Sequence, residues 1–273
     1  MFNIALMCSC HNRARLTKRS LNSITNTLKN TRLVDKFHFF VLDDCSVDET
    51  YIFLKNFKNT SVVKSDKNLY WAGGMNFCFN YFYKELIQYD LFIPFNDDIE
   101  LNVNNLDRLL DRYQELLEDK KEFILSVPCY YQDKITYSGS KFKIHSSIPL
   151  FKRVEPIKNT IIKVDVVNMN FLLIPMTIIK KYNFLDNYFT HSLADFAYSL
   201  KLKKHGIYSY LYDLPSVICE PNLTGRKKLK GINKLPQKKF YQEYFRFYYY
   251  FWPIRIVSGI IKLIFLKLSN KTN

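Results

Sequence analysis

Short apolar runs alternate with stretches of helical periodicity through the amino-terminal part of the chain. Runs of strand type cover residues 4–8, 37–42, 62–63 and 91–95, and apolar side chains recur at helical spacing over residues 16–28 and 76–87. Strands and helices in alternation favour a parallel sheet with helices on its faces. The pattern therefore predicts an α/β domain with a mostly parallel central sheet.

Polar side chains stand where three of these strands end. They are Cys8 and Ser9, Asp43 and Asp44, and Asp97 and Asp98. In open α/β sheets, ligands bind outside the carboxyl ends of the strands, so we expect the three pairs to converge on one crevice. This crevice is the candidate functional site.

Asp97 and Asp98 follow the apolar run 91–95 and precede a helical pattern. Carboxylate oxygens suit hard cations such as Mn²⁺ or Mg²⁺, which commonly lie between one or two protein carboxylates and the phosphates of a substrate. The pair therefore predicts a divalent metal site with a nucleotide diphosphate as ligand. The alternative is a turn followed by the start of a helix, because the same residue types favour that structure.

Two further segments allow both a binding and a structural interpretation. Residues 43–50 suit the start of a helix, with aspartate, serine and glutamate at capping positions. Gly73 and Gly74 are adjacent in a chain with only seven glycines, which indicates a close approach of the backbone or a positive φ. A diphosphate or donor sugar is the expected neighbour. Trp71 either offers an aromatic face to a sugar or base or packs in the core.

Four segments resemble motifs of the family 2 inverting glycosyltransferases, which have the nucleotide-binding GT-A (Rossmann-like) fold. Residues 9–13, 42–50, 68–76 and 95–98 match in the family's order and spacing. The resemblance implies a UDP- or dTDP-sugar donor, with Asp44 accepting a hydrogen bond from the imide edge of the base. It implies nucleotide or donor contacts from Cys8, Ser9, Asn12, Arg13, Asp43, Asp44, Asn68, Trp71, Gly73, Gly74 and Asp97. The implied metal ligands are Asp97 and Asp98.

Residues 193–206 resemble the acceptor-side helix that carries the catalytic base in this family, which assigns that role to Asp195. The chain has Ala194 and Ala197 where the family usually has further carboxylates. A carboxylate opposite the leaving group can accept the proton of an attacking hydroxyl, and such a single displacement inverts the anomeric carbon. The structural alternative is a solvated carboxylate early in a helix, which the helix dipole favours.

Residues 123–175 are short apolar stretches that we expect to form the acceptor face, including a strand over residues 164–170. Asp165 and Asn168 are the candidate acceptor contacts. Many relatives have a histidine after the last core strand that aids the metal, whereas residues 218–221 contain none. Glu220 is the candidate substitute.

The chain of 273 residues has 48% hydrophobic content, enough for one catalytic domain, which we assign to residues 1–219. The tail, residues 220–273, has 12 Lys and Arg against two Asp and Glu, and so carries +10 of the formal charge of +15. Its aromatic run 240–252 and amphipathic run 254–268 predict helices at the interface of an anionic membrane. The alternative is packing on the catalytic domain or across a homodimer. A membrane span is disfavoured, because residues 252–266 are short of the roughly 20 apolar residues required.

The six cysteines show no Cys-x-x-Cys spacing, which disfavours zinc sites and disulfides and fits a reducing cytosol. The start of the chain lacks the basic and apolar segments of a signal peptide. We therefore expect a cytoplasmic protein, peripheral on the inner face of the plasma membrane.

Two other function classes fit part of the pattern. A nucleic-acid-binding protein would explain the basic, aromatic tail, but the paired carboxylates would repel phosphate unless a metal were bound. A sugar-phosphate nucleotidyltransferase would need a glycine-rich phosphate loop after the first strand, where residues 9–13 contain no glycine. The preferred hypothesis is an inverting glycosyltransferase acting on a lipid-linked glycan in capsule or O-antigen synthesis, with no nucleic-acid partner.

Overall fold

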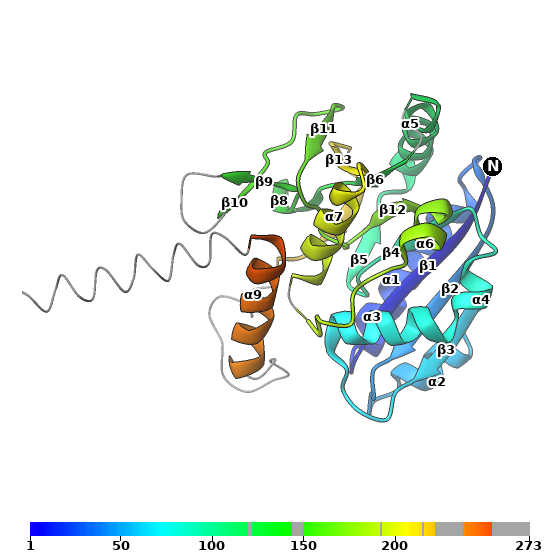
Figure 1. Ribbon diagram of the computed structural model, residues 1–273. Helices are drawn as coiled ribbons and strands as arrows, with labels where there is room; N and C mark the ends of the chain where they lie inside the picture. Colours follow the sequence, from blue (N-terminus) through cyan, green and yellow to red (C-terminus); the bar gives the residue numbers. More distant parts are fainter. Residues whose placement is uncertain (120–121, 144–149, 192, 215, 222–236, 253–273) are drawn as a thin grey trace, which may run out of the picture.

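The computed structural model describes residues 1–119, 122–143, 150–191, 193–214, 216–221 and 237–252. At its centre is an eight-stranded sheet (Figure 1). From edge to edge, the strands are β11 (Ile161–Val164), β13 (Tyr208–Tyr212), β6 (Phe123–Ser126), β12 (Leu172–Pro175), β4 (Leu91–Pro94), β1 (Phe2–Cys10), β2 (Val34–Asp43) and β3 (Thr60–Lys64). β12 is antiparallel to both neighbours and β11 is antiparallel to β13, whereas the other pairs are parallel. The expected α/β fold is confirmed.

Each face of the sheet carries its own apolar layer. In β1, Ala5 and Met7 belong to one layer, and Ile4 and Leu6 belong to the other, as alternation along a strand requires. The first layer includes side chains of α3 (Tyr70–Tyr81), α4 (Tyr83–Leu86), α6 (Met176–Tyr182) and α7 (Ala194–Lys204). The second includes those of α1 (Ala14–Lys29), α2 (Thr50–Lys55) and α5 (Leu106–Asp119). Because both faces are covered, the central strands contain long, nearly continuous apolar runs.

A second sheet extends the fold beyond the strand end of β4. Its strands are β5 (Ile99–Leu101), β14 (Val217–Cys219), β7 (Cys129–Tyr131) and β8 (Lys134–Tyr137), and a separate hairpin pairs β9 (Ser140–Lys143) with β10 (Leu150–Arg153). The helix expected directly after Asp98 is wrong: β5 and the short 3₁₀ helix η1 (Val103–Asn105) come before α5. β5 forms because it pairs with β14, a partner far away in the sequence that the local pattern does not reveal.

Two predicted boundaries also differ from the structure. The helix expected over 76–87 begins at Tyr70 and is interrupted after Tyr81, before α4. Its early start follows from contacts made by Asp44 and Asn68 to the backbone N–H of Tyr70. The strand expected over 164–170 ends at Val164, and beyond it only an isolated bridge joins Val166 to Ser140.

The tail contributes α9 (Gln237–Phe251), which lies beside α7 on the side of the molecule away from β1 (Figure 1). Phe247 is fully buried and contacts the rings of Phe151 and Phe189. One face of α9 therefore packs on the core. No helix in the described ranges is long and apolar enough to cross a bilayer. The amphipathic run 254–268 lies outside the described residues, and the boundary at residue 219 stays a prediction.

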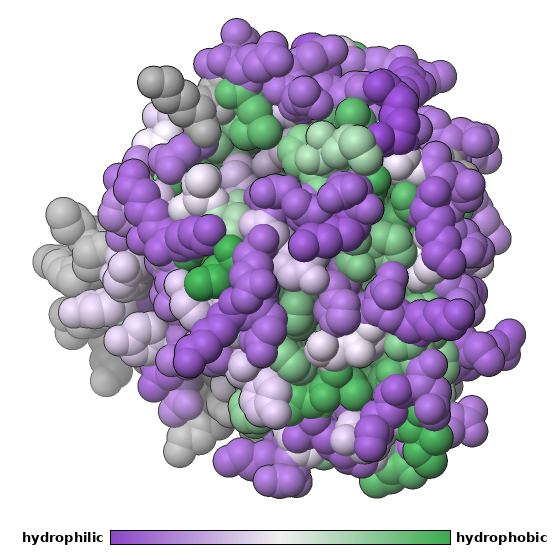
Figure 2. All heavy atoms as spheres, turned by 90° about the vertical axis from the view of Figure 1, so that its right-hand side faces the viewer, coloured by the Kyte–Doolittle hydropathy of each residue, from purple (hydrophilic) through white to green (hydrophobic). Residues whose placement is uncertain are grey.

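The face on the right-hand side of Figure 1, around β1 and α4, is mainly hydrophilic (Figure 2). Apolar side chains appear there in small patches separated by hydrophilic ones. Scattered exposed apolar residues are ordinary on protein surfaces and do not mark a docking site. This face therefore offers no broad apolar surface for a partner.

Gly74 is where α3 approaches the sheet most closely. A Cβ added there would lie 2.6 Å from Ser9 Oγ and 2.9 Å from Leu42 Cδ2, whereas the nearest atom to a Cβ at Gly73 is 3.7 Å away. Neither glycine has a positive φ. Close helix packing thus explains Gly74, and a ligand contact at Gly73 stays a prediction.

We expect Gly74→Ala to lower the free energy of unfolding by about 1–3 kcal/mol, because the added methyl overpacks the contact with Ser9 and Leu42. Gly73→Ala is the matched control and is expected to be neutral or to stabilise by up to about 1 kcal/mol through helix propensity. Urea unfolding of both variants measures the difference. Equal stability of the two variants would contradict the packing explanation.

Candidate active site

Neighbouring parallel strands bring their polar ends to one edge of the sheet. β1 lies between β4 and β2, and hydrogen bonds continue past the strands. The Cys10 carbonyl accepts from the Asp44 N–H at 2.8 Å, and the Met7 carbonyl accepts from the Phe95 N–H at 2.9 Å. The strand ends therefore converge on one site, as the sequence predicts.

Cys8 is an exception among the predicted contacts. Its side chain is fully buried in the apolar layer that packs against α1, and burial raises the pKa of its thiol well above the usual value. Successive side chains of a strand point to opposite faces, so Ser9 lies toward Gly74 and α3 instead. The Cys8 side chain is therefore turned away from the strand-end site, and a nucleotide contact through the Cys8 backbone stays a prediction.

Arg13 joins the two carboxylates after β4. Its Nη1 donates to Asp97 Oδ1 at 2.9 Å and to Asp98 Oδ2 at 3.2 Å, and Thr17 Oγ1 donates to the other Asp97 oxygen at 3.3 Å. Burial raises the pKa of Asp97 to about 6, and the charge of Asp97, with a smaller part from Asp98, raises the pKa of Arg13. The Asp98 side chain is 29% exposed against 6% for Asp97, so Asp98 is the more accessible to a ligand.

These carboxylates fit a divalent cation that takes its other ligands from a bound substrate. They already hold one positive charge between them, the guanidinium of Arg13. Within the described residues, no group of three or more His, Cys, Asp or Glu side chains is arranged to hold a metal alone. Asp98, which Arg13 contacts through one oxygen only, is the fitting protein ligand, whereas both oxygens of Asp97 already accept hydrogen bonds from Arg13 and Thr17.

Asp44 organises the loop before α3. Its carboxylate accepts from Ser65 Oγ at 2.8 Å, from Leu69 N–H at 2.8 and 3.0 Å, and from Tyr70 N–H at 3.1 Å, and it is nearly fully buried. Both oxygens are therefore occupied in this conformation. The predicted hydrogen bond from a base to Asp44 would require this loop to move.

Asp43 and Asn12 hold the neighbouring loops in place. The fully buried Asp43 accepts from the Ser46 N–H at 3.2 Å and lies 3.6 Å from Lys64 Nζ. Asn12 takes a positive φ, its N–H donates to Ser46 Oγ at 2.9 Å, and its Oδ1 accepts from the Val47 N–H at 2.8 Å. Both residues lie at the strand-end edge and shape its loops.

The segment before and within the first turn of α3 lies beside the site at the strand ends. Asn68 Oδ1 accepts from the Tyr70 N–H at 2.8 Å, an interaction that supports the positive φ of Tyr70. Trp71 is partly buried, and its Nε1 donates to Asn96 Oδ1 at 3.1 Å. Trp71 is thus fixed beside the carboxylate pair.

Asp195 lines a cavity of about 320 Å³. Leu193 precedes α7 with a left-handed backbone, and Asp195 lies in the first helical turn. Burial raises the pKa of Asp195 to about 6, although its Oδ1 accepts from the Phe196 N–H at 2.8 Å. The other residues around the cavity are mostly polar: Thr136, Tyr137, Ser138, Ser140, Arg153, Asn168, Asn170, Leu193 and Phe196.

A pair of side-chain amides connects this cavity to the carboxylate pair. Asn96 Nδ2 donates to Asn170 Oδ1 at 2.8 Å, and the Asn96 N–H donates to the Asn170 carbonyl at 3.1 Å. Asn170 lines the cavity, and Asn96 directly precedes Asp97. Sequence reasoning missed both asparagines as site residues, although each adjoins a buried apolar run, which is the signal that marked the aspartates.

Of the three remaining predicted contacts, one lies in the cavity and two have other partners. Asn168 lines the cavity. Asp165 does not, because its carboxylate accepts from the Phe142 N–H and pairs with Lys203. Glu220 lies 3.8 Å from a nitrogen of Arg19, which gives it another partner than a metal.

Solved structures share this fold. S. aureus TarS 1–349 in complex with UDP-GlcNAc has a TM-score of 0.57 and 12% identity, over 90% of this chain and 65% of that one. GalNAc-T7 with UDP, GalNAc and Mn²⁺ has a TM-score of 0.58 and 15% identity, over 80% and 44%. The chain spans less than two thirds of either protein. No curated protein matches the chain.

The sequence itself matches a family. The family model described as Glycosyl transferase family 2 covers residues 6–170, which is more than half of the chain. The matched range includes the strand ends with Asp43, Asp44, Asp97 and Asp98. The chain belongs to glycosyl transferase family 2, a family of glycosyltransferases.

Proposed function

We propose that the protein transfers a sugar from a UDP- or dTDP-sugar to a glycan acceptor, with inversion of the anomeric carbon. One observation carries the proposal: the bond between Asn96 and Asn170 joins the Asp195 cavity to the carboxylate pair. A single displacement needs the base and the leaving-group site on opposite faces of one anomeric carbon, so the two sites must adjoin. The UDP-GlcNAc bound by TarS and the UDP, GalNAc and Mn²⁺ bound by GalNAc-T7 support a uridine donor.

On the donor side, negative charge develops on the departing diphosphate. Arg13 lies beside Asp98 and brings a positive charge to this position. Mn²⁺ or Mg²⁺ held by Asp98 would supply Lewis-acid stabilisation of the leaving group. We assign Asp44 an indirect role: it holds the 65–70 loop, and the loop backbone forms the nucleotide wall.

On the acceptor side, Asp195 takes the proton of the attacking hydroxyl. With a pKa of about 6, its carboxylate is ionised near neutral pH and is a stronger base than an ordinary aspartate. Thr136, Ser138, Ser140 and Asn168 line the same cavity. Their polar groups suit the hydroxyls of an acceptor sugar, and the hydroxyl oxygens of Thr136 and Ser138 can accept, since their protons go to backbone carbonyls.

The stereochemistry of donor hydrolysis tests this function. With an α-linked UDP-sugar and no acceptor, water enters from the Asp195 side, and the first free sugar is expected to be the β anomer. Proton NMR within the first minutes, before mutarotation, distinguishes the anomers. Release of the α anomer first would contradict single displacement at Asp195.

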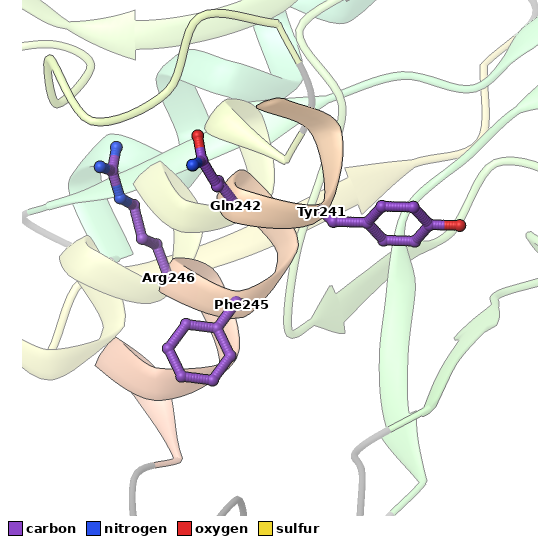
Figure 3. A pocket seen from close by; sticks show the side chains of 4 residues that line it. All are labelled: Tyr241, Gln242, Phe245 and Arg246. Atoms are coloured by element: carbon purple, nitrogen blue, oxygen red, sulfur yellow. The ribbon is translucent and has the colours of Figure 1, made fainter. Parts of the chain in front are cut away.

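For the acceptor and its location, we propose a lipid-linked glycan of surface-polysaccharide synthesis, at the cytoplasmic face of a plasma membrane. The exposed face of α9 supports this proposal: Tyr241, Phe245, Tyr249 and Tyr250 are each more than half exposed. Figure 3 shows the side chains of Tyr241, Gln242, Phe245 and Arg246 projecting from α9. These four residues line a hollow of about 420 Å³. Aromatic and basic side chains on one helix face suit an anionic membrane interface.

We expect Phe245→Ser with Tyr249→Ser to weaken binding to phosphatidylglycerol vesicles by about ten-fold or more, because two exposed aromatic contacts are lost. Phe77→Ser with Tyr81→Ser is the matched control, since this stacked pair is also exposed and four residues apart on α3. Vesicle sedimentation measures binding. Equal losses in both variants would contradict a membrane role for the α9 face.

A further inference from the structure

One carboxylate on α9 is buried although most of the helix surface is aromatic and exposed. Glu243 is 2% exposed, and its Oε1 accepts from the Thr190 N–H at 2.7 Å and also from the Thr190 hydroxyl. Burying a carboxylate is costly unless hydrogen bonds compensate. The contact between Glu243 and Thr190 is therefore a specific attachment of the tail to the segment before α7.

Thr190 in turn holds the start of α3. Its carbonyl accepts from the Ala72 N–H at 2.9 Å and from the Gly73 N–H at 3.0 Å. The first N–H groups of a helix have no partner within the helix, so an outside acceptor fixes where the helix begins. Glu243 and Thr190 together thus form a chain of hydrogen bonds from α9 to the first turn of α3.

This first turn is a wall of the donor site. The preceding amides of Leu69 and Tyr70 donate to Asp44, and Trp71 donates to Asn96 beside the carboxylate pair. The same segment that carries Thr190 leads directly into Asp195. A shift of Thr190 would therefore disturb both the nucleotide wall and the position of the base.

We propose that Glu243 is a positioning residue for sugar transfer, which holds Thr190 so that the first turn of α3 stays in place against the donor. This inference rests on the proposed nucleotide-sugar function. It makes α9 a part of the active-site framework. Removal of the Glu243 acceptor should loosen the first turn of α3 first and weaken nucleotide binding as a consequence.

Hydrogen exchange on the full chain tests the positioning without any ligand. Glu243→Ala is expected to speed exchange in the peptide that contains Ala72 and Gly73 by about ten-fold, the size of a lost bond to a charged group. Glu243→Gln keeps an oxygen acceptor and is expected to restore slow exchange. Gln242→Ala, the exposed neighbour on α9, is the matched control and should change nothing. Wild-type exchange in Glu243→Ala would overturn the proposal.

Nucleotide binding separates this inference from the proposed function. In wild type and each variant, UDP titration is followed by the fluorescence of Trp71 in a Trp252→Phe background, since these are the only two tryptophans. Glu243→Ala should raise the Kd for UDP by about ten-fold, and Glu243→Gln by less than about three-fold. If the wild type binds no nucleotide, the proposed sugar-transfer function is overturned. The hydrogen-exchange experiment still tests whether Glu243 holds the first turn of α3.

Thr190→Val is the second variant for this test. If Glu243→Ala fails to fold, Thr190→Val removes one of the two bonds to Glu243 and keeps the Thr190 carbonyl. It is expected to speed exchange of the same peptide by about three-fold. Unchanged exchange in a folded Thr190→Val protein, with unchanged UDP affinity, would overturn the positioning role.

Discussion

Asp195→Asn is expected to lower the rate of sugar transfer by about a hundred- to ten-thousand-fold, which is the usual contribution of a general base. UDP affinity should stay within about two-fold of wild type, because Asp195 lines the acceptor cavity and not the diphosphate site. Asparagine keeps an oxygen that can accept from the Phe196 N–H, so the local backbone is preserved. Initial rates and UDP titrations on the same samples give both quantities.

Asp165→Asn is the matched control for this substitution. Asp165 is also a partly buried carboxylate on the acceptor side, but it pairs with Lys203 outside the cavity. Its replacement should leave transfer within about three-fold of wild type, as for a residue away from the reacting atoms. Normal turnover by Asp195→Asn would exclude Asp195 as the base.

Asp195→Asn is also expected to be more stable than wild type at alkaline pH. The folded pKa of Asp195, about 6, lies above its usual value of 3.8, so folding favours the protonated acid. The stability that protonated Asp195 contributes to the wild-type fold is fully present below about pH 4 and is lost as the pH rises through 6. At pH 8, Asp195→Asn should therefore gain on the order of 3 kcal/mol relative to wild type. Urea unfolding at pH 4 and pH 8 measures the change, and a gain that is equal at both pH values would contradict it.

Asp98→Asn is expected to abolish metal-dependent nucleotide binding and to lower transfer by about a hundred- to a thousand-fold, because the leaving group loses its Lewis acid. Binding without metal should change little, since the backbone wall at residues 65–70 is held by Asp44. Titration of UDP with and without Mn²⁺ separates the two contributions.

Glu100→Gln is the matched control for Asp98, because Glu100 is a nearby carboxylate that pairs with Arg19. It should bind UDP as wild type does, with or without Mn²⁺. An Asp98→Asn protein that keeps a full response to Mn²⁺ would remove the metal assignment.

The central sheet was predictable because its strands are buried on both faces. Such strands are continuous apolar runs, and β1, β2 and β4 each end at a polar pair. Their convergence then follows from the geometry of a parallel sheet. The strand ends and the family resemblance both indicated Asp97 and Asp98, whereas Asp195 was indicated by the resemblance of residues 193–206 alone.

Other features depend on contacts between distant residues and leave no local signal. β5 follows Asp98 because it pairs with β14, and α3 starts at Tyr70 because Asp44 accepts its amide. Cys8 looked like a strand-end residue, but the pleat turns its side chain into the core. The bond from Thr190 to Glu243 joins residues 53 positions apart, so no sequence window contains both.

The most direct test of a nucleotide-sugar site at these strand ends is calorimetry with UDP, dTDP, GDP and CDP on folded wild-type protein, with and without Mn²⁺. We expect binding of UDP or dTDP that Mn²⁺ strengthens by about ten-fold or more, because a cation between Asp98 and the diphosphate offsets the charge of both. Failure of all four nucleotides to bind would contradict the proposed function.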